Sequence, residues 1–179
     1  KEAVKWLTKA AEQSEARAQN NLGVMYEDGR GVLQDYREAV KWHTKAAEQG
    51  HAVAQFNLAR KYRNGEGVPQ DDKEAVKWYT KSAEQGEVSS QFNLALMYRN
   101  GQGVPQDYKE AVKWYAKSAE QGNDAAQFDL AFMYGMGNEV PQDFVYAHMW
   151  ANIANANGNE KAREMRNVVA GGMTSDQLA

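Results

Sequence analysis

Residues 87–122 read EVSSQFNLALMYRNGQGVPQDYKEAVKWYAKSAEQG, and this 36-residue stretch decides the fold. The preceding stretch, residues 51–86, is identical to it at 27 of 36 positions. The same spacing continues along the chain without slip, and it is clearest in five tryptophans: Trp6, Trp42, Trp78, Trp114 and Trp150. A fixed period of this length indicates stacked copies of one supersecondary unit.

Each unit is predicted to be a pair of helices. In the first half of residues 87–122, Leu94, Ala95 and Tyr98 follow the spacing of one helical face. In the second half, Ala111 and Tyr115 do the same, and neither half shows the alternation typical of a strand. We therefore expect an all-α protein in which Tyr98 and its equivalents are large core residues.

Glycine and aspartate mark the ends of these helices. Gly101 follows the first helix, where a left-handed residue ends a helix at little cost. Asp107 and Glu110 have the spacing of a capping box at the start of the second helix, which Gly122 ends. The pair Gly101 and Gly103 lacks a preceding strand and recurs in the loops of the first two full repeats, so we interpret it as structural and not as a phosphate-binding motif.

The pattern AQxxLxxxY…GxGVPQDxxEAVKWYxKxAEQG resembles the Sel1-like repeat (SLR) family, a relative of the tetratricopeptide repeat. The resemblance covers essentially the whole chain. It implies a right-handed α/α superhelix in which the first helix of each pair lines a concave face. It also implies an adaptor or scaffold that assembles protein complexes, commonly in bacteria. Some members are cysteine-rich and exported, but this chain has no cysteine, so expectations about disulfides do not carry over.

On this interpretation the chain is a single solenoid over residues 1–179. A half repeat at 1–14 precedes full repeats at 15–50, 51–86, 87–122 and 123–158. Residues 159–179 are expected to form a helical cap, because atypical terminal units close a solenoid against water. Thr174 and Gln177 indicate a short last helix within that cap.

Composition and motifs argue against several function classes. The net charge of −3 does not favour nucleic-acid binding, and no apolar run is long enough to suggest membrane insertion. No serine is followed by lysine three residues later, and there is no His-Glu-x-x-His motif. We expect no enzyme activity, cofactor or metal site. Two alternatives stay open: a cell-wall-ligand binder or β-lactamase-like enzyme, and a spacer within a longer protein. The compartment is not indicated.

The predicted partner site lies on the first helices, where the rows beginning at Asn20, Val24 and Glu27 face the groove. In related tetratricopeptide domains such rows contact the bound peptide. The candidate residues are Phe56, Arg60, Arg63, Phe92, Leu96, Arg99, Phe128 and Phe132. They suggest a protein or peptide partner with apolar anchors and acidic groups. The phenylalanines fit packing between helices equally well.

The sequence also supports predictions for the tryptophans, for His43 and for Lys61. The tryptophans are predicted to pack in the core, with the charges around them in solvent. His43 replaces a tyrosine of other repeats and is expected to be a partly buried packing residue. Lys61 stands in a row of methionines, so it is expected either to reach the surface along its alkyl chain or to mark the rim of a binding patch.

Overall fold

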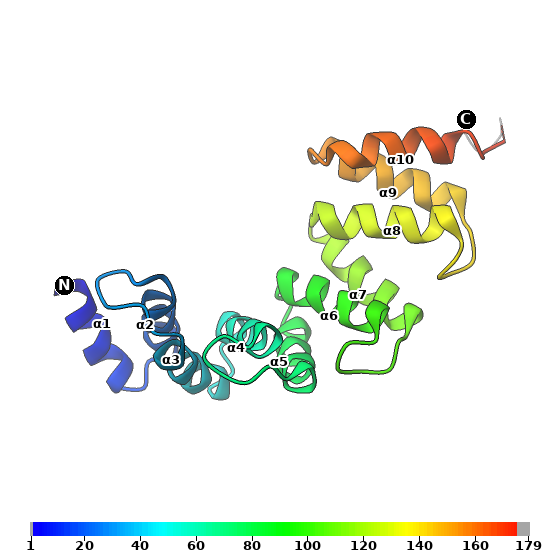
Figure 1. Ribbon diagram of the computed structural model, residues 1–179. Coiled ribbons are helices and arrows are strands. Elements are labelled where there is room, and N and C mark those ends of the chain that lie inside the picture. The colour runs from blue at the N-terminus through cyan, green and yellow to red at the C-terminus, as the bar shows by residue number, and fades with distance from the viewer. Residues whose placement is uncertain (1, 175–179) are drawn as a thin grey trace. The chain divides into compact units, whose positions relative to one another are not determined.

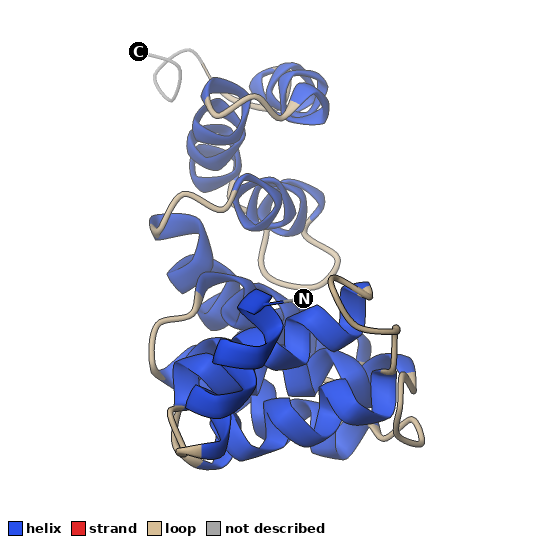
Figure 2. Cartoon of the chain, turned by 90° about the vertical axis from the view of Figure 1, so that its left-hand side faces the viewer, coloured by secondary structure: helices blue, strands red, loops and turns tan. Residues whose placement is uncertain are grey.

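The computed structural model describes residues 2–174, and within that range it consists of ten helices and no strand (Figures 1 and 2). The helices are α1 (Glu2–Glu12), α2 (Ala16–Asp28), α3 (Tyr36–Glu48), α4 (Ala52–Asn64), α5 (Asp72–Glu84), α6 (Val88–Asn100), α7 (Tyr108–Glu120), α8 (Asp124–Met136), α9 (Phe144–Ala156) and α10 (Glu160–Ala170). The all-α prediction is confirmed. Gln177, part of the expected last helix, lies outside the described residues.

The helix ends follow the predicted aspartates and glycines, with one correction. Asp107 caps α7 by accepting hydrogen bonds from the backbone N–H groups of Lys109 and Glu110. The Glu110 carboxylate, however, pairs with Lys113 at 3.0 Å and does not complete a capping box. The Asp107 N–H instead donates to the Tyr98 carbonyl of the preceding helix at 2.9 Å. That bond joins the two helices of a hairpin directly.

The second glycine of the loop between two helices of a repeat lies very close to the backbone of the preceding repeat. At Gly67, φ is +78° and a Cβ would lie 2.3 Å from the carbonyl oxygen of Tyr36 at the start of α3. Gly103 approaches the Asp72 carbonyl at the start of α5 in the same way. Only glycine permits this contact, so the recurring GxG pair has the structural role expected of it.

The chain divides into two compact units. The first contains the residues up to Ser90 together with Gln102–Val104, and the second contains Gln91–Gly101 and the residues from Pro105 onward. In the first unit α2 packs with α3 and α4 with α5, while α8, α9 and α10 pack together in the second (Figure 1). Whether the two units continue one solenoid, as the sequence predicts, stays a prediction.

Buried glutamines connect helices within and between repeats. Gln19, at the start of α2, donates to the Ala11 carbonyl of α1 at 3.0 Å and accepts from Gln49, at the end of α3, at 2.7 Å. Gln55 makes the same two contacts one repeat later, at 3.1 and 2.7 Å. These bonds explain the Ala-Gln and Glu-Gln-Gly signatures, because each glutamine satisfies a carbonyl near the end of the preceding helix.

The aromatic core differs in part from the prediction. Trp42, Trp78 and Trp114 are only 6–8% exposed, as expected, but Trp6 is 69% exposed. Trp42 packs in a cluster with residues of α1 and α2, and no such helix pair precedes Trp6 in the described residues. Tyr98 is half-buried, whereas Tyr115 on the second helix of the same hairpin is fully buried. The largest aromatic core contact therefore belongs to the second helix.

Candidate functional site

Two of the candidate phenylalanines pack against the second helix of their own hairpin. Phe56 is half-buried, with its ring centroid 6.0 Å from that of Tyr79. Phe92 lies 5.8 Å from Tyr115 in the same tilted arrangement, and Leu96 is also half-buried. The rings of Phe56 and Phe92 therefore stabilise the hairpin, and they leave limited area for a partner.

The candidate arginines are held within the protein. The Arg60 guanidinium lies 3.1 Å from Glu27. Arg99, whose side chain is 19% exposed, contacts Glu139 at 3.0 Å and Asp129 at 3.5 Å. Arg63 is half-buried. Because Arg60 and Arg99 are neutralised by carboxylates of this chain, they offer less attraction to an acidic partner than the sequence pattern suggested.

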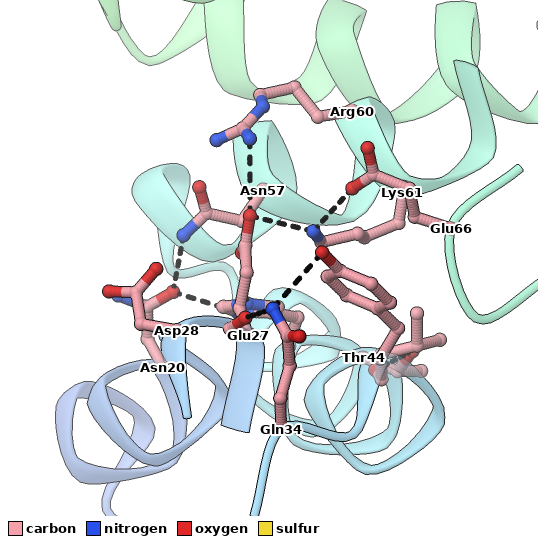
Figure 3. A network of polar contacts seen from close by, with 12 residues as sticks. Asn20, Glu27, Asp28, Gln34, Thr44, Asn57, Arg60, Lys61 and Glu66 are labelled. Atoms are coloured by element: carbon pink, nitrogen blue, oxygen red, sulfur yellow. Dashed lines mark hydrogen bonds and ion pairs between the residues drawn. The ribbon is translucent and has the colours of Figure 1, made fainter. Parts of the chain in front are cut away.

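A buried ion cluster lies between the first and second full repeats (Figure 3). The Lys61 side chain has no exposed surface, and its ammonium lies 2.7 Å from both Glu27 and Glu66. The ammonium also faces the Tyr36 ring at 4.8 Å. Both expectations for Lys61 are therefore wrong: it neither reaches the surface nor marks a rim. The two carboxylates compensate its removal from water.

His43 extends this cluster into the core. Its Nδ1 lies 3.1 Å from Asn20 Oδ1, which also accepts a 3.0 Å hydrogen bond from Asn57 (Figure 3 labels both asparagines). Its Nε2 faces Glu27 at 3.7 Å, which is long for a hydrogen bond. A Cβ at Gly23 would lie 2.7 Å from the imidazole, so glycine makes room for the ring. His43 is a packing residue, as expected, but it is wholly buried.

The electrostatics of this cluster are those of a structural ion pair. The His43 imidazole, the Lys61 ammonium and the Arg60 guanidinium lower the pKa of Glu27 from its ordinary 4.5 to about 2, although burial opposes them. Burial lowers the pKa of His43, although Glu27 acts against it. Glu27 is therefore ionised at neutral pH. Because the Lys61 and His43 side chains are fully buried, a ligand has no access to either of them.

The second unit carries an open apolar groove between α8 and α10. Phe128 and Phe132 line one side, Met165 and Val168 line the other, and Lys161 and Glu164 also border it. Phe132 is 36% exposed and Val168 69% exposed. Of the eight candidate residues, Phe128 and Phe132 line this groove together.

Sequence reasoning missed the α10 side of this groove. Val168 lies 36 residues after Phe132, and Glu164 lies 36 residues after Phe128, so both continue the predicted rows. The leucine and tyrosine signature is absent after residue 158, so the marker residues do not extend the rows that far. The 36-residue period alone would have predicted that α10 is equivalent to the first helix of a repeat.

Other kinds of site have no support in the part of the chain that the structure describes. There, no group of three or more histidine, aspartate or glutamate side chains is placed to hold a metal ion. Within residues 2–174, every helix is too short or too polar to cross a membrane.

The fold defines a class, that of solenoid proteins built from helical hairpins. The Sel1 repeat family matches residues 1–15, 16–51, 52–87, 88–123 and 124–159. The chain belongs to the Sel1 repeat family. Proteins built of these repeats are generally protein-interaction scaffolds and are typically non-catalytic.

Solved structures show the same fold. A protective antigen of uropathogenic Escherichia coli with an SLR fold is 42% identical, with a TM-score of 0.86 over 89% of this chain. A Sel1 repeat protein of Oxalobacter formigenes is 38% identical, with a TM-score of 0.82 over 90% of this chain. Helicobacter pylori cysteine-rich protein B, 24% identical with a TM-score of 0.55 over 70% of this chain, shares the fold.

The relatives differ in length. This chain covers 34% of the Escherichia coli protein, 66% of the Oxalobacter protein and 90% of the Helicobacter protein. It thus spans about a third of the length of the Escherichia coli protein. The comparison with curated proteins gave no match.

Proposed function

We propose that this chain is an interaction scaffold that binds a partner protein or peptide in the groove between α8 and α10. The observation that supports the proposal is the exposure of Phe132 and Val168 across a groove whose other lining includes Phe128 and Met165. Exposed apolar surface of this kind, bordered by polar groups, is typical of docking sites. The pocket-based alternatives, a cell-wall-ligand binder or an enzyme, gain no comparable observation.

The groove suggests the chemistry of the partner. Its lining offers two phenylalanines, a methionine and a valine, which favour apolar anchor side chains. Lys161 is the cation that borders the groove, and it could pair with one acidic group of the partner. Arg99 lies over the Phe132 ring at 5.7 Å but already pairs with Glu139. We therefore expect apolar anchors to contribute most of the affinity and an acidic group to adjust it.

A displayed peptide library can test this proposal even while the natural partner is unidentified. Peptides are selected on the immobilised chain, and the dissociation constant of the selected peptide is then measured by calorimetry. We expect Phe132→Asp and Val168→Asp each to weaken binding at least about tenfold, equal to about 1.4 kcal/mol. Val53→Asp is the matched control, because Val53 is 45% exposed on α4, outside the groove.

Two groove variants are used because one of them could unfold the protein. Val168 is 69% exposed, so its replacement should leave the fold intact even if Phe132 contributes to packing. Melting temperatures are compared for all variants. If both groove variants bind the selected peptide as tightly as the unmodified chain, the groove is not the binding site.

A further inference from the structure

Arg99 binds a carboxylate that belongs to a loop of this chain. The Glu139 carboxylate accepts hydrogen bonds from Arg99 Nε at 3.0 and 3.1 Å and from Arg99 Nη2 at 3.0 Å. Glu139 lies in the loop between α8 and α9, and its equivalents in the three earlier loops are Gly31, Gly67 and Gly103. Those glycines have no side chain, so only this loop places a carboxylate at that position.

The middle of this loop cannot pack as the earlier loops do. A Cβ at Gly67 or Gly103 would lie 2.3 Å from a backbone carbonyl oxygen, so Glu139 cannot make the equivalent approach. The end of the loop keeps its usual anchor, because the Gln142 amide donates to the Gly135 carbonyl at 2.9 Å, as its equivalents do in two other loops. The ion pair therefore takes the place of the backbone packing that holds the middle of the earlier loops.

The cluster around Arg99 is reachable from solvent. The side chains of Arg99, Asp129 and Glu139 are 19%, 19% and 22% exposed, whereas the side chain of Lys61 in the other ion cluster has no exposed surface. The Arg99 guanidinium also lies over the Phe132 ring at 5.7 Å, and Phe132 lines the groove between α8 and α10. A carboxylate bound to Arg99 therefore lies beside the groove.

We propose that Arg99 is a carboxylate-binding subsite of this groove, and that Glu139 occupies it until an acidic group of the partner takes its place. The proposal rests on the proposed function, because it assigns the acidic part of the partner to a residue of the same groove. The planar guanidinium binds a carboxylate through two of its N–H groups. A partner carboxylate in the position of Glu139 makes the same hydrogen bonds, so the exchange loses none of them.

Of the two carboxylates on Arg99, Glu139 is the one suited to exchange. Asp129 lies on helix α8 and makes a single contact with Arg99 at 3.5 Å. Glu139 lies in a loop, and its carboxylate returns to water when it leaves. During the exchange Asp129 stays beside Arg99, so the half-buried guanidinium is never left without a negative partner, which would be costly.

This arrangement makes the groove selective. A tethered carboxylate competes with the partner at the high effective concentration of an intramolecular group. A partner that offers a carboxylate alone gains only the bonds that Glu139 already makes. A partner that places an apolar side chain against Phe132 at the same time gains that contact as well, so we expect recognition of an acidic residue next to an apolar anchor.

Peptide binding to the whole chain with and without the Glu139 charge tests the proposal. A displayed library is selected on the unmodified chain and on Glu139→Gln, which keeps the size of the side chain. For each selected peptide, a matched peptide carries amides in place of its carboxylates. By calorimetry we expect Glu139→Gln to tighten binding of the acidic peptide at least about fivefold and to change binding of the amide peptide less than about twofold.

Asp124→Asn is the charge-matched control, because it removes one carboxylate from the exposed first turn of α8. An equal gain in Asp124→Asn overturns the proposal, because net charge would then explain the effect. Selection on Glu139→Gln that does not enrich acidic residues also overturns it. So does a crystal structure of the complex in which Glu139 still binds Arg99.

These outcomes are separable from a failure of the proposed function. If Phe132→Asp weakens binding of the selected peptide but Glu139→Gln does not favour the acidic form, the subsite is wrong and the groove stands. If Phe132→Asp and Val168→Asp both leave binding unchanged, the groove itself is wrong, and the subsite fails with it.

Discussion

Lys61 shows, at the residue scale, how a buried charge depends on its partners. Its ammonium has no exposed surface and lies 2.7 Å from two carboxylates, Glu27 and Glu66. The equivalent position in the next two repeats is Met97 and Met133, both fully buried. The first and second full repeats therefore meet through ions at a place where other repeats use an apolar side chain.

Replacing Lys61 with methionine should destabilise the protein even though methionine is the usual residue of the row. Glu27 and Glu66 would lose their shared cation, and breaking a buried pair on one side costs about 3 kcal/mol. Urea unfolding measures the change. Lys113→Met is the control, because Lys113 is exposed and should change stability by no more than about 0.5 kcal/mol. Adding Glu27→Gln should recover part of the loss, and equal effects of Lys61→Met and Lys113→Met would contradict the cluster.

Acid should weaken the same cluster through Glu27. Its pKa in the folded protein is about 2, below its ordinary 4.5, so ionised Glu27 stabilises the fold above pH 4.5. That stability is lost as the pH falls from 4.5 toward 2, and it amounts to at most about 3 kcal/mol at 1.36 kcal/mol per pKa unit. Urea unfolding of Glu27→Gln should show a smaller loss of stability over that range. A parallel decline in both proteins would show that Glu27 is not the responsible group.

The sequence predicts residues of this kind only in part. The row of methionines identified Lys61 as unusual, but its partner Glu27 is 34 positions earlier in another repeat. Burial of the Lys61 ammonium depends on its distance from the Glu27 carboxylate. The repeat period of the sequence does not predict that distance. The helix-capping aspartates, in contrast, act on neighbours two and three residues away and could be predicted.

At the scale of elements, close packing restricts which residues a loop can contain, as it does for the helices. Gly67 and Gly86 both have positive φ, +78° and +90°. They differ in their surroundings: a Cβ at Gly67 would lie 2.3 Å from the Tyr36 carbonyl oxygen, whereas nothing lies within 4 Å of a Cβ at Gly86. The loop at Gly67 thus packs directly on the start of α3.

This pair of glycines gives a matched test of loop packing. Alanine at Gly86 should cost only the strain of a left-handed backbone, about 1–2 kcal/mol. Alanine at Gly67 should cost clearly more, because the backbone must also move away from α3. The free energies of unfolding from urea titrations decide between them. If Gly86→Ala proves as costly as Gly67→Ala, the close approach does not matter to stability.

Elements near the end of the chain show where prediction fails. α10 keeps the period but lacks the leucine and tyrosine of the repeat pattern, so the pattern does not lead to Glu164 and Val168. The apolar face of α9 was missed for a related reason. Hydrophobic periodicity identifies a helix by its buried side, whereas α9 departs from the other repeats on its exposed side, at Val145, Met149 and Ile153.

At the scale of the whole molecule, a repeating core supports surfaces that do not repeat. The glutamine contacts and buried alanines recur in both units. The groove, by contrast, joins α8 of the last full repeat to α10. The exposed apolar residues Val145, Met149 and Ile153 lie on α9. Equivalent positions thus share the contacts that stabilise the fold, whereas the exposed apolar surfaces depend on local departures from the repeat pattern.

The most direct test of the proposed scaffold role is hydrogen–deuterium exchange of the full chain with and without the selected peptide. We expect the peptide to slow amide exchange in α8 and α10, around Phe132 and Val168, and to leave α2 and α4 unchanged. Val168→Asp should abolish that protection at the same peptide concentration. Protection of another segment, with none in α8 or α10, would contradict the assignment of partner binding to this groove.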